Sequence, residues 1–184
     1  MLYIMRHGKT DWNTKKKLQG CTEIPLNDEG RAMAETARKE YKDIPIDICY
    51  CSPLIRARET ADIFLKDRNI PIIYDDRLKE MGFGIFEGIE NSFNIPDCPV
   101  NEFFYHPEEY IEPVEGGESL DSLFNRTGEF LDEVVYPKLA QGKNILIMGH
   151  GAMNSAIVCR IKFGSDRSRF WEEGIPNCKL IHLI

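Results

Sequence analysis

The chain opens with Leu2-Tyr3-Ile4-Met5-Arg6-His7-Gly8, where four apolar residues run directly into an arginine, a histidine and a glycine. A short apolar run that ends at such a turn signal predicts a buried strand over Leu2–Met5. In open α/β sheets, ligands bind beyond the carboxyl ends of the strands. The opening stretch therefore predicts both a core strand and a place for chemistry at its end.

The rest of the chain alternates between short apolar runs and amphipathic segments. The apolar runs predict four more strands, at residues 46–51, 72–74, 144–148 and 179–183. The amphipathic segments predict four helices, over residues 28–41, 53–66, 119–136 and 151–162. Asn27 is the expected N-cap of the first, and Ser52 is that of the second, with Pro53 at its first position. The third is expected to begin at Ser119 and to be ended by Pro137. This alternation favours an α/β fold, a three-layer α/β/α sandwich around a mainly parallel central sheet.

Residues 81–118 interrupt the alternation. The stretch is rich in glycine and proline, with room for a short helix near residues 101–110. A long loop of this kind inside a compact domain is usually functional, and 184 residues suit one domain. We therefore expect a single domain over residues 1–184, in which residues 81–118 form a loop-rich lid over the site.

The composition narrows the class of protein. The sequence is 42% hydrophobic and 29% charged with a net charge of -7, which is typical of a globular domain and disfavours nucleic acid or a membrane surface as partner. No apolar run is long enough to cross a bilayer, and Arg6 and His7 interrupt the apolar start, so no signal peptide is predicted and a cytoplasmic location is expected. The six cysteines show neither a C-x-x-C pair nor zinc spacing and are predicted to be reduced core thiols.

Polar clusters follow three of the predicted strands: Arg6-His7-Gly8, Ser52 to Arg56, and Gly149-His150-Gly151. Because the carboxyl ends of parallel strands meet at one edge of a sheet, Arg6, His7, Arg56 and His150 are expected to converge. Arginine forks bind phosphate oxygens, and an imidazole nitrogen can accept a phosphoryl group. These residues indicate a pocket for a phosphate monoester. Taken one at a time, each cluster has another interpretation. Arg6 and His7 are compatible with a surface pair, Gly149-His150-Gly151 with a turn, and Arg56 with a solvent-facing arginine on a helix.

A series of short motifs carries a family resemblance. The blocks are Arg6-His7-Gly8-Lys9-Thr10 with Asn13, Gln19-Gly20, Pro25-Leu26-Asn27 with Gly30, Ser52-Pro53-Leu54 with Arg56-Ala57, Leu78-Lys79-Glu80, Glu87-Gly88, Gly116-Gly117-Glu118-Ser119 and Gly149-His150-Gly151. In this order and over most of the chain, they resemble the histidine phosphatase superfamily, which includes the phosphoglycerate mutase-like proteins. The resemblance implies the phosphoglycerate mutase-like fold.

The resemblance also implies a role for each site residue. His7 would be the nucleophile that takes the phosphoryl group and forms phosphohistidine. Glu80 would be the acid and base, and Arg6, Arg56 and His150 would hold the phosphate. The residues Asn13, Gln19 and Gly151 would complete the phosphate or substrate contacts. The family uses no metal or other cofactor in this reaction, and none is expected here.

Two positions depart from the family pattern. Lys17 stands where many members have arginine before Gln-Gly, and Ala152 replaces a glycine often found after His150. Neither change touches the phosphate core, but both weaken any transfer of a substrate from a known relative. We therefore expect a small phosphorylated metabolite as substrate, and either a monomer or a homodimer.

Hydrolysis is favoured over phosphoglycerate mutase-type transfer. Residues 89–118 carry eight acidic side chains, Asp97, Glu102, Glu108, Glu109, Glu112 and Glu115 among them, and no lysine or arginine, which makes a poor clamp for a bisphosphoglycerate. Two further alternatives are a non-catalytic scaffold that binds a phosphorylated partner and a metal-dependent hydrolase. All five expected catalytic residues are present, which weakens the first, and the second lacks an H-x-H or H-E-x-x-H pattern. The aromatic residues of the lid, Phe93, Phe103, Phe104 and Tyr105, either stack on a substrate ring or pack the lid, and packing is favoured.

Overall fold

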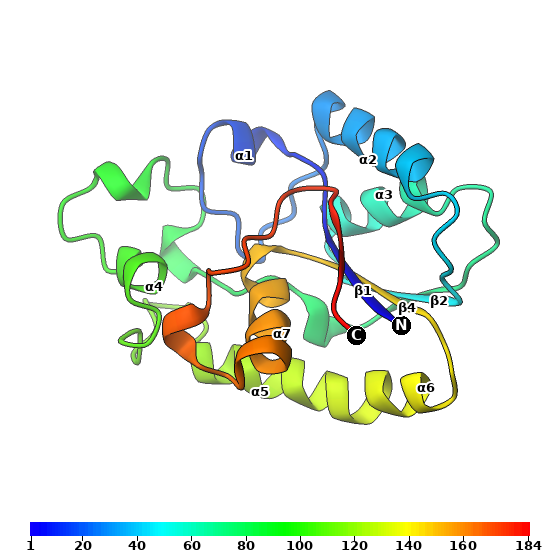
Figure 1. Cartoon of the computed structure of the whole chain (residues 1–184). Coiled ribbons are helices and arrows are strands. Elements are labelled where there is room, and N and C mark those ends of the chain that lie inside the picture. Colours follow the sequence, from blue (N-terminus) through cyan, green and yellow to red (C-terminus); the bar gives the residue numbers. More distant parts are fainter.

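A five-stranded sheet forms the centre of the protein in the computed structural model, which describes residues 1–184 (Figure 1). Its strands are β1 (Leu2–Arg6), β2 (Ile48–Cys51), β3 (Ile72–Tyr74), β4 (Ile145–Gly149) and β5 (Leu180–His182). They lie in the order β3-β2-β4-β1-β5, and only β5 runs antiparallel to its neighbour. The predicted mainly parallel sheet is confirmed.

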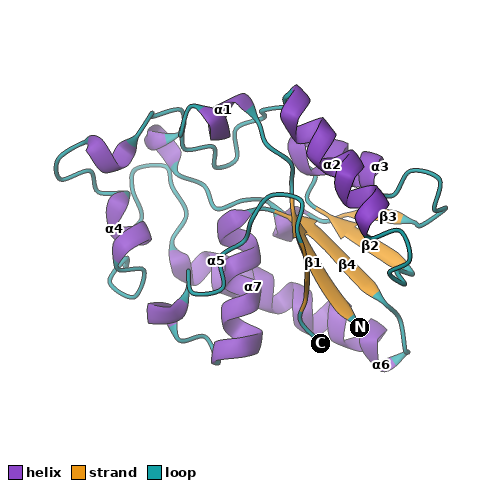
Figure 2. Ribbon diagram, turned by 45° about the horizontal axis from the view of Figure 1, so that its top comes forward, coloured by secondary structure: helices purple, strands orange, loops and turns teal.

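Helices cover both faces of this sheet (Figure 2). One layer holds α2 (Asp28–Glu40) and α3 (Ile55–Phe64), and the other holds α5 (Leu120–Phe130), α6 (Tyr136–Ala140) and α7 (Gly151–Phe163). Side chains alternate along each strand, so Met5 packs in the core under α2 and α3 while Ile4 packs in the larger core under α5 and α7. The predicted three-layer α/β/α sandwich is therefore confirmed.

Of the three side chains predicted to begin a helix, two cap it and one does not. Asn27 Oδ1 accepts the Gly30 N–H at 2.8 Å, and Ser119 Oγ accepts the Ser122 N–H at 3.1 Å. Ser52 does not cap α3, which begins at Ile55. The Ser52 hydroxyl is instead paired with His150, so the end of β2 contributes to the polar site before the helix begins.

Pro137 does not end the long helix, as the sequence had indicated. A π-helical turn over Leu131–Val135 follows α5, and α6 continues to Ala140. Pro137 lies in the first turn of α6, where its missing N–H is tolerated. The wider turn thus lets the chain stay helical through a residue that normally stops it.

Residues 81–118 extend beyond the carboxyl ends of the parallel strands (Figure 1). They contain two short 3₁₀ turns and α4 (Asn101–Tyr105), which is shorter than the helix expected near 101–110. The short helix α1 (Asp11–Thr14) was not predicted, although Thr10 and Asn13 form a capping box at its start.

Two expectations drawn from composition concern the state of the cysteines and the presence of a membrane-spanning segment. All six cysteines are free thiols, and five of them are buried, with Cys21 as the exposed exception. None of the helices has both the length and the apolar character needed to span a membrane.

Candidate active site

A cavity of about 200 Å³ opens at the carboxyl ends of β1 and β4. The predicted site residues that line it are Arg6, His7, Asn13, Gln19, Arg56, Glu80 and Gly151. They come from six separate stretches of the chain, and the sheet brings them together. Glu80 is the one carboxylate in the lining, against the buried Arg56, the partly buried Arg6 and the partly exposed Lys17. The excess of positive charge suits an anion.

The His7 ring is fixed in one tautomer. Its Nδ1 lies 2.7 Å from the Gly8 carbonyl oxygen. Because a carbonyl only accepts, Nδ1 carries the proton and Nε2 keeps a free lone pair. The bond from Nδ1 is the only hydrogen bond of the ring, so Nε2 has no partner in the protein, and His7 lines the cavity. The His7 carbonyl accepts from Asn177 Nδ2 at 2.6 Å, and the Gly8 N–H donates to Thr60 Oγ1 at 3.0 Å, so the backbone that carries the ring is also held.

His150 lies behind His7 rather than on the cavity lining. It is fully buried, its ring centroid is 5.1 Å from that of His7, and its Nε2 is 2.7 Å from Ser52 Oγ. Its Nδ1 is buried without a hydrogen-bond partner. The structure thus brings His150 next to His7 as predicted from the strand ends, but outside the cavity lining.

Burial and the neighbouring guanidinium groups both lower the pKa of His7 and of His150. The pKa of His7 lies well below its ordinary value because the ring is buried and because Arg56 and Arg6 repel a second positive charge. The pKa of His150 is lowered for the same reasons, with His7 as a further neighbour. Both rings are therefore neutral near pH 7, which leaves the His7 Nε2 lone pair available.

Arg56 is the most deeply buried charge of the site. It is fully buried, and its Nη1 and Nη2 donate to the Thr22 and Gly20 carbonyls at 2.8 and 2.6 Å. Arg6 Nη1 donates to the Ile175 carbonyl at 3.1 Å. In both arginines Nε is buried with no partner. An unpaired buried donor is costly, so both groups are arranged to gain from an anionic ligand.

Glu87 supports the loop that holds Arg56. Its carboxylate accepts the N–H groups of Cys21 and Thr22 at 3.0 and 2.9 Å, together with that of Phe83 at 3.1 Å. This fixes the loop whose carbonyls accept from Arg56. Glu87 was part of a recognised motif, but nothing in its position along the sequence indicated this supporting role.

Thr10 orients the two amide side chains of the site. Its N–H donates to Asn13 Oδ1 at 3.1 Å, and its hydroxyl donates to Gln19 Oε1 at 2.9 Å. With both amide oxygens occupied, the NH₂ groups of Asn13 and Gln19 are left to donate to a ligand.

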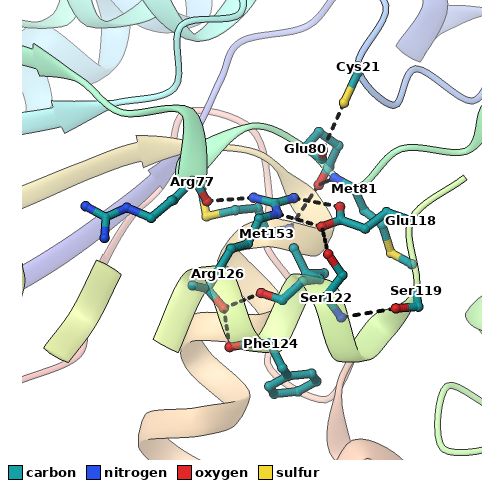
Figure 3. A network of polar contacts seen from close by, with 12 residues as sticks. Cys21, Arg77, Glu80, Met81, Glu118, Ser119, Ser122, Phe124, Arg126 and Met153 are labelled. Carbon is teal, nitrogen blue, oxygen red and sulfur yellow. Dashed lines mark hydrogen bonds and ion pairs between the residues drawn. The ribbon is translucent and has the colours of Figure 1, made fainter. Parts of the chain in front are cut away.

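Glu80 lies at the N-terminus of α7. Its Oε2 accepts the Ala152 N–H at 3.1 Å. Its Oε1 accepts the N–H groups of Met153 and Met81 at 2.9 Å each (Figure 3). The carboxylate therefore satisfies amides of the first turn of α7 and lies at the positive end of its dipole. These bonds hold it beside the cavity.

A half-buried ion pair anchors the segment that carries Glu80. Arg126 on α5 forms two parallel bonds to Glu118, at 2.7 Å from Nε and 2.9 Å from Nη2 (Figure 3). Arg126 Nη1 also donates to the Arg77 carbonyl at 2.6 Å, and the Glu118 N–H donates to the Gly82 carbonyl at 2.9 Å. The chain is thus tied to this pair on both sides of Glu80.

Sequence reasoning missed part of the cavity wall. Its apolar members include Leu18, Phe83, Phe104 and Trp171. Trp171 belongs to no motif and reaches the site only through aromatic packing. Of the four lid aromatics considered, only Phe104 lines the cavity, while Phe103 is fully buried in the core. No group of three or more His, Cys, Asp or Glu side chains is placed to hold a metal ion.

The chain belongs to the histidine phosphatase superfamily (branch 1), whose pattern it matches over residues 2–184. It is 36% identical over 163 residues to the uncharacterized phosphatase PhoE of Bacillus subtilis, covering 88% of this chain and 77% of that protein. It is 30% identical over 164 residues to a 2,3-bisphosphoglycerate-dependent phosphoglycerate mutase of Cytophaga hutchinsonii, again covering 88% and 77%. The solved structure of Bacillus stearothermophilus YhfR is similar with a TM-score of 0.85 at 28% identity, covering 97% of this chain and 88% of that one.

The two depressed histidine pKa values predict a pH-dependent stability. Below pH 6.5 the unfolded chain binds protons at His7 and His150 that the folded protein does not, so the free energy of unfolding falls as the pH falls. Between pH 7.5 and 5.5 we expect a loss of up to about 1.4 kcal/mol for each of the two rings. Urea unfolding at the two pH values measures it.

The matched control replaces two other histidines. Replacing both His7 and His150 by glutamine should flatten the pH dependence, whereas replacing the exposed His106 and His182 should leave it. An unchanged slope in the His7 and His150 variant would contradict the argument.

Proposed function

We propose that the protein is a metal-independent phosphomonoester hydrolase that works through a phosphohistidine at His7 and acts on a small phosphorylated metabolite. The observation that carries the proposal is the unpartnered Nε2 of His7, a residue that lines the cavity together with Arg6 and Arg56, whose Nε atoms are buried and unpaired. A phosphoryl group placed there meets a nucleophile and the positive charge that stabilises its equatorial oxygens.

In the first step, His7 Nε2 attacks phosphorus and the bond to the leaving oxygen breaks. Glu80, protonated at this stage, gives its proton to that oxygen, and the alcohol departs. Arg6 and Arg56 hold the phosphoryl oxygens throughout, with Asn13 and Gln19 as further donors, and His150 supports the His7 ring from behind.

In the second step, Glu80 takes a proton from water, whose oxygen attacks phosphorus. The bond between phosphorus and Nε2 breaks, and inorganic phosphate leaves with His7 in its starting tautomer. The amides of α7 that donate to Glu80 hold its carboxylate beside the cavity, where this step requires a base.

His7→Ala is expected to abolish turnover with the fold retained, a loss of at least about 10³-fold in kcat. The wild-type protein mixed briefly with a ³²P-labelled monoester should yield a labelled chain that loses its label in acid and keeps it in base. His106→Ala, a change at an exposed histidine of the lid, is the control and should be neutral. Normal turnover by the His7 variant would rule out the mechanism.

Glu80→Gln should slow turnover most for esters with poor leaving groups, because these depend on protonation, with a loss of about 10² to 10⁴-fold. Measuring kcat for a series of esters with leaving groups of different basicity tests this. Glu90→Gln, an exposed change that does not line the cavity, is the control. An equal loss across the series would assign the proton to another group.

Mutase activity is the second candidate, since a phosphoglycerate mutase is among the relatives. A mutase must grip a second anionic group, yet residues 81–118 carry no lysine or arginine. With 2,3-bisphosphoglycerate supplied, we expect no conversion of 3-phosphoglycerate to 2-phosphoglycerate in a coupled assay, while monoesters are still hydrolysed. Sustained conversion would favour the mutase.

A further inference from the structure

The cavity has two chemically different walls. The strand ends supply the polar wall around Arg6, His7 and Arg56. The other wall is apolar and comes from segments outside the sheet: Leu18 from the loop after α1, Phe83 and Phe104 from residues 81–118, and Trp171 from the stretch after α7. A phosphoryl group at His7 occupies the polar wall, so the alcohol part of the substrate faces the apolar one.

The apolar wall is built as one packed unit. The rings of Phe104 and Trp171 are stacked, with centroids 5.7 Å apart and an interplanar angle of 21°, and Phe83 lies 5.9 Å from Phe104. The Trp171 Nε1–H donates to the Phe103 carbonyl at 3.0 Å. Since this bond occupies the one polar atom of the indole, Trp171 offers a ligand only its ring surface.

Leu18 is fixed against the same segment. Its N–H donates to the Ile89 carbonyl at 3.1 Å, and its carbonyl accepts the Gly88 N–H at 2.8 Å. The apolar wall is therefore held in place before any ligand binds, which reduces the entropy cost of binding a rigid apolar group against it.

No free cation faces the alcohol part of a substrate. Lys17 is the one lysine of the lining, and its Nζ lies 4.0 Å from Glu90 and over the Trp12 ring. Residues 81–118 add only acidic charge. A second anionic group on the substrate would lose water without gaining a counter-charge, which is unfavourable.

We propose that the substrates are monoesters of alcohols that carry a planar or extended apolar group and no second anionic group, with Trp171 and Phe104 as the residues that determine this specificity. The inference rests on the proposed hydrolase function and names the class of substrate for the same site.

Three synthetic esters test the substrate class with similar leaving groups: 2-phenylethyl phosphate, propyl phosphate and 2-(4-carboxyphenyl)ethyl phosphate. The wild-type kcat/KM for the phenylethyl ester should exceed that for the propyl ester by about tenfold or more, as expected for burial of an aromatic group. The added carboxylate should cancel most of this gain. Equal kcat/KM values for the phenylethyl and propyl esters, or a higher kcat/KM for the carboxyphenyl ester than for the phenylethyl ester, would overturn the inference.

Two variants locate the effect on the apolar wall. Trp171→Ala and Phe104→Ala should each lower kcat/KM for the phenylethyl ester by about tenfold and that for the propyl ester by about threefold at most. If Trp171→Ala fails to fold because it loses the bond from Trp171 to the Phe103 carbonyl, Phe104→Ala still tests the apolar wall, since it leaves that bond in place. Tyr105→Ala is the control, since Tyr105 lies on the same helix, is 61% exposed and does not line the cavity.

The outcomes separate the two proposals. Hydrolysis of all three esters at equal rates, with a phosphoenzyme at His7, would overturn the substrate class and leave the hydrolase intact. An equal loss of kcat/KM for the phenylethyl and propyl esters in the Trp171 and Phe104 variants would reduce these residues to a structural role and overturn their part in specificity. No hydrolysis of any ester and no phosphoenzyme would overturn both proposals.

Discussion

The burial of Arg56 is the constraint on which the rest of the site depends. A guanidinium cannot lose its charge in a protein, and taking it out of water is expensive unless its donors are satisfied. Two of those donors find the carbonyls of Gly20 and Thr22, and Glu87 holds the backbone of that loop. One buried charge thus dictates the path of the 20–22 loop and the place of Glu87. Burial keeps the neighbouring histidines neutral, and the charge of Arg56 adds to this effect. The fold thus fixes where this desolvated charge lies.

Local chemistry made much of the fold predictable from the sequence. Asn27 and Ser119 cap helices because their side-chain oxygens accept N–H groups of the first turn that follows them. Ser52 has the same capping ability, but its hydroxyl is paired with His150, 98 residues further along the chain. Pro137 behaves unlike a helix terminator because a π-helical turn precedes it. In both failures a feature beyond the local sequence decided the outcome.

The candidate site was predictable where residues follow strands, and not where packing alone places them. Arg6 and His7 continue β1, so the topology of the sheet fixes where they lie. Trp171 has no such relation to a strand end, and it reaches the cavity by stacking on Phe104. Motifs therefore predicted the polar part of the cavity, while its apolar wall is defined only by packing in three dimensions.

The contact from Asn177 to the His7 carbonyl also bears on how the protein is made. His7 is synthesised 170 residues before the side chain that holds its backbone. Ile175, which accepts from Arg6, lies close to Asn177 in the sequence. During translation Arg6 and His7 thus lack these contacts until residues 175 and 177 have been synthesised. A nascent chain that stalls before residue 175 carries Arg6 and His7 without the residues that hold them in the folded protein.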